Sequence, residues 1–132
     1  MANKFNITMV TPDGKKHLDN CEILNVVTSS GALGIMANHL PLVAILEISH
    51  LNYKKDGQVY SYSISGGIIT VKKEETILLL ESFESEHEID LKRAEESKQR
   101  AEKRLASKEE GIDIKRAEIA LKRALNRISL VK

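Results

Sequence analysis

The chain has 132 residues, of which 42% are hydrophobic, 30% charged and only 4% aromatic. These values fit one or two small globular domains with an aliphatic core. The longest apolar run, Leu42 to Leu46, is far shorter than the ~20 residues of a membrane-spanning helix, so we expect no direct membrane insertion. The single cysteine, Cys21, excludes an internal disulfide. We also expect no signal or transit peptide, because the N-terminus has neither a long apolar region nor an Arg-rich one.

The distribution of charge divides the chain near Ser85. Residues 1–85 contain seven Lys, no Arg and nine acids, a net charge of −2, whereas residues 86–132 contain thirteen Lys and Arg and ten acids, a net charge of +3. All six arginines follow position 92. We therefore predict one domain over residues 1–85 and a second over residues 86–132.

The first part has the pattern of short strands separated by turns. Apolar and polar residues alternate between Phe5 and Met9, and Thr11-Pro12-Asp13-Gly14 then supplies a turn. Asp56-Gly57 is a strong hairpin signal, and Gly66-Gly67 breaks a later apolar segment. Regular spacing without a helical period favours an antiparallel β-sandwich or barrel. Strands are predicted at 5–9, 21–28, 42–48, 51–55, 58–64, 68–71 and 76–81.

The second part has the period of two amphipathic helices that repeat each other. Ile89-Asp90-Leu91-Lys92-Arg93-Ala94-Glu95 recurs 23 residues later as Ile112-Asp113-Ile114-Lys115-Arg116-Ala117-Glu118. Asp90 and Asp113 stand at N-cap positions, and Gly111 with the polar run before it separates the helices. The short connection predicts an antiparallel helical hairpin.

The second helix is predicted to need cover from outside the hairpin. Ile119, Leu121 and Leu125 stand where the first helix has Glu96, Lys98 and Glu102. The wider apolar face should pack on the sandwich or on a partner.

No catalytic motif is found. The chain lacks a phosphate-binding loop of the Walker type and a nucleophile elbow, and its four His residues do not have metal-ligand spacing. We therefore expect neither an enzyme nor a metal site.

The arginines leave two interpretations open. Arg123 and Arg127 are four residues apart, a like-charge spacing that costs an isolated helix stability unless carboxylates or phosphates face it. The alternative is a solvated face with helical ion pairs. Nucleic-acid binding is disfavoured, because acids are abundant nearby and no aromatic residue lies among the arginines.

Over its whole length the chain resembles the epsilon subunit family of F-type ATP synthases. The resemblance rests on Gly31-Ala32-Leu33-Gly34-Ile35, His39-Leu40-Pro41-Leu42, Ser65-Gly66-Gly67 and the Ile89 to Ala94 motif together with Arg123 and Arg127. It implies a sandwich of about ten strands at the foot of the central stalk, bound to the gamma subunit and the ring of c subunits. It also implies a mobile hairpin that extends towards the alpha/beta catalytic head and inhibits ATP hydrolysis. Because the mitochondrial counterpart would normally begin with a targeting sequence, we expect a bacterial origin, at the cytoplasmic face of the cell membrane, with a plastid as the second choice.

The resemblance also implies particular site residues, with ATP as a regulatory ligand and no required cofactor. Gly31, Ala32 and His39 fall in the expected contact loop, where Ala32 replaces the acidic residue common in the family. The ATP-binding residues would be Ile89, Asp90, Arg93, Ala94, Arg123, Arg127, Glu84 and Arg100. The inhibitory contact to the beta subunits would use Lys115, Arg116, Lys122, Arg123 and Arg127.

Two other classes of protein remain as alternatives. One is a free-standing adaptor, in which the helical tail of a sandwich recruits unrelated partners. The other, with little support, is a sandwich enzyme acting on a small molecule.

Overall fold

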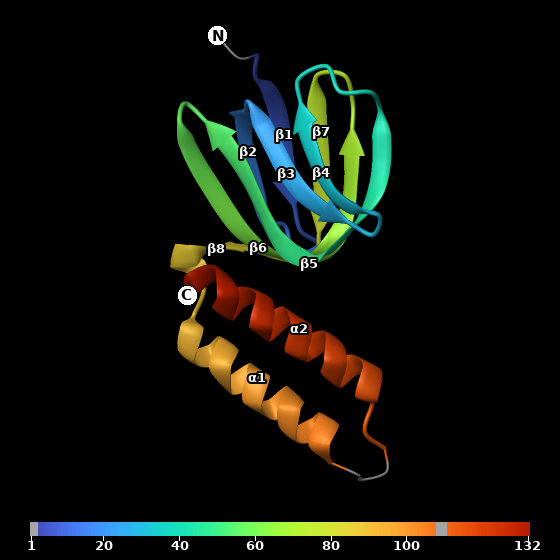
Figure 1. Cartoon of the computed structure of the whole chain (residues 1–132), viewed down its shortest axis with the longest axis vertical. Helices are drawn as coiled ribbons and strands as arrows, with labels where there is room; N and C mark the ends of the chain where they lie inside the picture. Colours follow the sequence, from blue (N-terminus) through green and yellow to red (C-terminus); the bar gives the residue numbers. More distant parts are fainter. Residues whose placement is uncertain (1–2, 108–110) are drawn as a thin grey trace.

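The computed structural model describes residues 3–107 and 111–132. A β-sandwich is followed by one turn of 3-10 helix and two antiparallel α-helices, with α2 lying between α1 and the sandwich (Figure 1). The strands are β1 (Phe5–Val10), β2 (Lys16–Cys21), β3 (Ile23–Thr28), β4 (Gly31–Met36), β5 (Leu42–Lys55), β6 (Gln58–Val71), β7 (Glu75–Leu80) and β8 (Phe83–Ser85). The helices are η1 (Glu86–Glu88), α1 (Leu91–Ala106) and α2 (Ile114–Val131).

Of the eight strands in the described residues, seven follow one hydrogen-bonded path in the order β2-β1-β7-β6-β5-β3-β4, and β8 pairs with β6 off this path. The expected break at Gly66-Gly67 does not end a strand, because β5 and β6 each run for 14 residues and pair along nearly their whole length. The strands predicted at 42–48 and 51–55 are therefore one strand, and so are those at 58–64 and 68–71, whereas the pattern did not predict β2, β4 and β8. One pair departs from the antiparallel pattern, since β1 and β7 are parallel.

The turn signals are confirmed. Lys55 pairs with Gln58 across Asp56 and Gly57, which both have positive φ, as a two-residue hairpin requires. The turn at Thr11 to Gly14 joins β1 to β2, with Gly14 donating its N–H to the Thr11 carbonyl at 3.0 Å. The core is mainly aliphatic, but it also contains Phe5, Tyr53, Tyr62 and Phe83, so the prediction of a purely aliphatic core was wrong; Cys21 is fully buried within it.

The helix signals are also confirmed. Asp90 Oδ1 accepts the Arg93 N–H at 3.1 Å, and Asp113 Oδ1 accepts the Arg116 N–H at 3.0 Å, so both repeat aspartates are N-caps. Small side chains at equivalent positions of the repeat form the seam between the helices, which lets the two backbones approach closely. The buried alanines of this seam are Ala94, Ala101, Ala117 and Ala124.

The hairpin contacts the sandwich through α2, and the contact is polar. The Asn126 side-chain amide donates to the Ser49 carbonyl and the Ser63 hydroxyl, both at 2.8 Å, and to the Ile64 carbonyl at 3.3 Å. His50 Nε2 lies 2.8 Å from the Asn126 carbonyl oxygen. We name these groups of Asn126, His50, Ser49, Ser63 and Ile64 the Asn126 dock.

Docking covers only part of the apolar face of α2. Ile114, Ile119 and Leu125 remain 60%, 38% and 44% exposed. The docked hairpin therefore leaves apolar surface of α2 uncovered, as the sequence predicted for a helix that needs cover from outside the hairpin.

Gly67 stands at a position in the sandwich that has no room for a side chain. Its φ is +152°, and a Cβ would lie 2.1 Å from the Leu79 carbonyl oxygen of the neighbouring strand. Gly67→Ala should lower the free energy of unfolding by about 3 kcal/mol or more, because overpacking adds to backbone strain. Gly14→Ala is the matched control: φ is also positive there, but the space around it is open, so a loss of about 1 kcal/mol is expected. Urea unfolding at equal m-values measures both, and equal losses would contradict the packing argument.

Asn126→Asp tests the dock. A carboxylate would face two backbone carbonyls and would lose the donated hydrogen bonds, so α2 should separate from the sandwich. Amide hydrogen exchange in β5 and β6 next to α2 should accelerate about tenfold, as expected for the loss of about 1.4 kcal/mol. Glu118→Gln, exposed on the same helix, should leave the exchange unchanged. Unchanged exchange in Asn126→Asp would show that apolar contacts alone hold α2.

Candidate functional site

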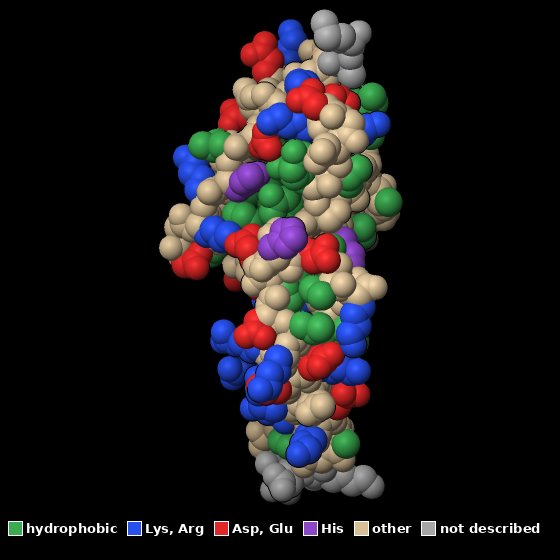
Figure 2. All heavy atoms as spheres, turned by 90° about the vertical axis from the view of Figure 1, so that its left-hand side faces the viewer, with side chains coloured by type: hydrophobic (Ala, Val, Ile, Leu, Met, Phe, Trp, Pro, Cys, Tyr) green, Lys and Arg blue, Asp and Glu red, His purple; other side chains and the backbone are tan. Residues whose placement is uncertain are grey.

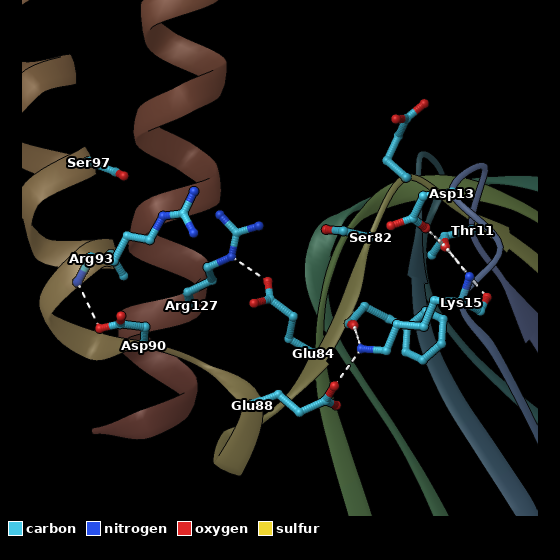
Figure 3. Close-up of a pocket in the computed structure, with 13 residues that line it drawn as sticks. Thr11, Asp13, Lys15, Ser82, Glu84, Glu88, Asp90, Arg93, Ser97 and Arg127 are labelled. Carbon is cyan, nitrogen blue, oxygen red and sulfur yellow. Dashed lines mark hydrogen bonds and ion pairs between the residues drawn. The ribbon is translucent and has the colours of Figure 1, made fainter.

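A pocket of about 460 Å³ lies where the sandwich, the linker and both helices meet (Figure 3). The turn between β1 and β2 forms one wall, the chain from Glu81 to Asp90 another, and the helices close it. Its lining combines carboxylates, cationic side chains and hydroxyls. The lining residues are Thr11, Asp13, Lys15, Glu81, Ser82, Phe83, Glu84, Glu88, Asp90, Arg93, Ala94, Ser97 and Arg127.

Two arginines from different helices converge in this pocket. Arg93 comes from α1 and Arg127 from α2, and their guanidinium groups lie beside each other (Figure 3). Arg127 Nε donates to Glu84 Oε1 at 2.5 Å, and both side chains of this pair are about three-quarters buried. Two guanidinium groups thus lie side by side, and the Glu84 carboxylate is paired with one of them. Guanidinium groups arranged in this way suit the binding of an anion.

The start of α1 completes the wall beside Arg93. Ile89 is buried, Asp90 is the N-cap, and Ala94 is both buried and a pocket residue. Because Asp90 Oδ1 already accepts the Arg93 N–H, this carboxylate orders the first turn that carries the Arg93 side chain.

Ile89, Arg100 and Arg123, the remaining predicted ATP residues, lie outside the lining. Arg100 donates to the Ser97 hydroxyl at 3.0 Å, and Ser97 does line the pocket. Arg123 is half-buried one turn before Arg127, and its Nε is buried without a hydrogen-bond partner in the part of the chain that the structure describes. The structure thus brings Glu84, Asp90, Arg93, Ala94 and Arg127 around one cavity.

Lys15 is a pocket residue that the sequence did not indicate. Its Nζ donates to the Phe83 carbonyl and to Glu88 Oε2, both at 2.6 Å, and lies 4.4 Å from the centre of the Phe83 ring. Glu88 Oε1 accepts the Ser85 N–H at 3.1 Å. Burial alone would raise the pKa of Glu88, but the hydrogen bonds from Lys15 and Ser85 outweigh it and hold the pKa below its usual range.

Some of the missed lining had a sequence signal. Ser85-x-x-Glu88 matches a capping box, which would have drawn attention to Glu88. Thr11, Asp13 and Lys15 had none, because their sequence indicates only a turn, and the pairing of distant strands brings them to the helices.

The cationic residues expected to meet a partner lie on α2. Lys115, Arg116 and Lys122 are exposed, whereas Arg123 and Arg127 are half-buried in the docked hairpin. Lys and Arg side chains are frequent on the face of the hairpin seen in Figure 2, mixed with acids.

The sandwich carries a separate apolar surface. Ile45 pairs with Ile68 and Ile68 with Leu79 across three neighbouring strands, and these side chains are 63%, 45% and 54% exposed. We name Ile45, Ile68 and Leu79 the apolar stripe. Ile45 and Ile68 also line a hollow with Gly31 and Ala32, which are exposed at the start of β4. His39 lies in the following loop, where its Nδ1 is 2.7 Å from the Leu40 carbonyl oxygen.

Among residues 3–107 and 111–132, three or more His, Cys, Asp or Glu side chains nowhere come together as metal ligands would. Neither described helix combines the length and the apolar character that crossing a bilayer demands.

Fold and site together define the class of the protein as a β-sandwich carrying an antiparallel helical hairpin, with an arginine-lined pocket at their junction. Residues 4–86 match the model of the ATP synthase delta/epsilon chain beta-sandwich domain, and residues 87–132 match that of its long alpha-helix domain. The chain therefore belongs to the ATP synthase delta/epsilon chain family.

Individual relatives agree with this assignment. The chain is 47% identical over 107 residues to the ATP synthase epsilon chain of Alkaliphilus oremlandii, covering 81% of this chain and 80% of the relative. It is 42% identical over 124 residues to that of Bacillus subtilis, covering 94% of each.

Solved structures show the same fold. A chain in the Euglena gracilis mitochondrial ATP synthase OSCP/F1/c-ring structure aligns with a TM-score of 0.83 at 21% identity, covering 98% of this chain and 82% of that one. The predicted membership of the ATP synthase epsilon subunit family is therefore confirmed.

Proposed function

We propose that this chain couples rotation of the stalk to the catalytic head and regulates it through the helical hairpin. In this proposal ATP binds at the junction pocket and stabilises the docked hairpin. Without ATP the hairpin extends along the gamma subunit and inhibits hydrolysis. The two domains would divide the work, with residues 1–85 holding the rotor and residues 86–132 acting as the regulatory switch.

The observation that carries the ATP proposal is the convergence of Arg93 and Arg127 from two helices on one cavity. Like charges brought together repel unless an anion lies between them, and guanidinium groups bind phosphates in bidentate fashion. One carboxylate, Glu84, occupies the Nε of Arg127. An incoming triphosphate would use the remaining N–H groups, with Arg123 and Arg100 close by on the same two helices.

Such a ligand would bias the switch because its site exists only in one arrangement. The pocket is built from α1, α2 and the sandwich together, so separating the hairpin dismantles it. A ligand shifts a conformational equilibrium by the difference between its affinities for the two states. ATP would therefore favour the docked state in proportion to its concentration.

The undocked hairpin would have a second place to bind. Ile114, Ile119 and Leu125 offer apolar surface that the sandwich leaves uncovered. Lys115, Arg116 and Lys122 lie exposed on the same helix, and release would free Arg123 and Arg127. An acidic segment of the beta subunits in the alpha/beta head fits this combination. Two packings that use the same helix make a bistable element.

The sandwich would supply the permanent contacts to the rotor. The apolar stripe of Ile45, Ile68 and Leu79 is suited to the gamma subunit, since contiguous exposed apolar side chains mark interaction surfaces. The loop with Gly31, Ala32 and His39 would approach the c ring, where Ala32 offers no charge. These partners would place the chain at the cytoplasmic face of a bacterial cell membrane, as a peripheral subunit.

Calorimetry on the full chain tests the ligand. We expect ATP to bind at millimolar concentration or below, and Arg127→Ala to weaken binding about tenfold or more, because a charge-assisted hydrogen bond contributes about 1.5–3 kcal/mol. Arg104→Ala, an exposed arginine on α1 outside the pocket, is the control and should bind ATP as the unchanged chain does. Absence of any binding heat at millimolar ATP would refute the ATP proposal and leave the family assignment intact.

Inhibition is tested in a reconstituted complex of this chain with the gamma subunit and the catalytic head. Arg123→Ala with Arg127→Ala should raise ATP hydrolysis several-fold at ATP concentrations too low to fill the junction pocket, because the extended hairpin loses cationic contacts. Lys103→Ala, exposed on α1, serves as the matched control. Hydrolysis that stays equally inhibited in the double variant would contradict the proposed contact.

A further inference from the structure

The linker, defined as β8 with η1 and the residues up to Asp90, is the covalent connection through which the sandwich positions the hairpin. It runs from Phe83 to Asp90, passes through a single turn of 3-10 helix, and adopts extended backbone at Ile89 before α1 begins. Glu84 and Asp90, near the two ends of this segment, are both pocket residues. The shape of the pocket therefore depends on how this linker is held.

One side chain from a distant part of the chain holds it. Lys15, at the end of the turn between β1 and β2, spans 68 residues of sequence to the Phe83 carbonyl and 73 to the Glu88 carboxylate. Its Nζ thus binds a backbone group and a side-chain group of the linker at the same time. Glu88 is in turn fixed by the Ser85 N–H, so the cation, the carboxylate and the 3-10 turn form one connected network.

We propose that Lys15 is a positioning residue, a latch that holds the linker so that the hairpin stays docked and the pocket keeps its shape. The latch acts through Phe83 and Glu88, and contact between Lys15 and a ligand is not required. Its role in hairpin docking stands on the contacts just described, while its effect on ATP affinity rests on the proposed function.

The geometry favours a positional role over simple stabilisation of the sandwich. Lys15 Nζ directs its two hydrogen bonds to the linker (Figure 3). Lys16, the next residue, is exposed, and none of the ion pairs or side-chain hydrogen bonds found among the described residues involves it. The two lysines have equal charge and adjacent positions but unlike contacts, which provides a matched control within one turn.

Distance measurements between spin labels test the latch in the full chain. Labels at Lys73→Cys, exposed between β6 and β7, and Glu118→Cys, exposed on α2, report the separation of sandwich and hairpin. Cys21 is fully buried and its thiol pKa is raised to about 12, mainly by burial, so it should not take up label. The unchanged chain should give one narrow distance distribution.

Lys15→Met should add a longer distance, with the undocked population rising about fivefold, and should weaken ATP binding by a similar factor. Glu88→Gln keeps the Phe83 contact, so it should shift both readouts in the same direction by less. Lys16→Met should match the unchanged chain, and Lys15→Arg should restore most of the docked population.

The two readouts separate this inference from the proposed function. If the unchanged chain binds no ATP, the ATP proposal fails. The positioning role of Lys15 is then tested by the spin-label distances alone. Distances in Lys15→Met equal to those in Lys16→Met would overturn it. A sandwich destabilised in Lys15→Met, with docking unaffected once unfolded protein is discounted, would overturn it as well.

Discussion

The side-chain amide of Asn126 fixes α2 to the sandwich, together with contacts of His50 and the ion pair between Arg127 and Glu84. Asn126 reaches from α2 into the surface of β5 and β6 and donates to groups of Ser49, Ser63 and Ile64. Two of these acceptors are main-chain carbonyls, so the contact fixes the helix to the sheet backbone. Arg127 follows in sequence, and its position beside Glu84 is a consequence of this docking. The pocket at the junction exists because α2 is held in one register.

A polar dock has a physical consequence that an apolar one would not have. Each hydrogen bond between docked groups contributes only about 1 kcal/mol net, since water replaces it on separation. The seam between the two helices is different, because four alanines are buried there against each other. This seam is apolar and does not depend on contact with the sandwich. The helices should therefore stay paired while the hairpin as a whole is held more weakly. This ranking of interactions is what a switch between two positions requires.

The sequence and the structure disagree where local signals compete with long-range pairing. Gly66-Gly67 indicates a strand break, yet β6 continues through both glycines, because the missing side chain at Gly67 lets β7 approach closely. The parallel pairing of β1 with β7 joins segments about seventy residues apart and leaves no local trace. Lys15 lies beside a simple turn signal, and only the fold brings it to Glu88. The capping pair of Ser85 and Glu88, by contrast, is a local pattern that the sequence does contain.

The sequence by itself determined the two-domain order, the hairpin turn at Asp56-Gly57, the caps at Asp90 and Asp113, and the alanine seam. These are local features, set by backbone geometry and by helical or strand periodicity within one segment. Its family motifs also pointed to most of the arginines and acids that surround the pocket. Only the tertiary structure decided which of them meet, because that depends on the docking of α2 by Asn126 and the holding of the linker by Lys15. Both contacts join residues more than sixty positions apart, and no spacing within a segment encodes them.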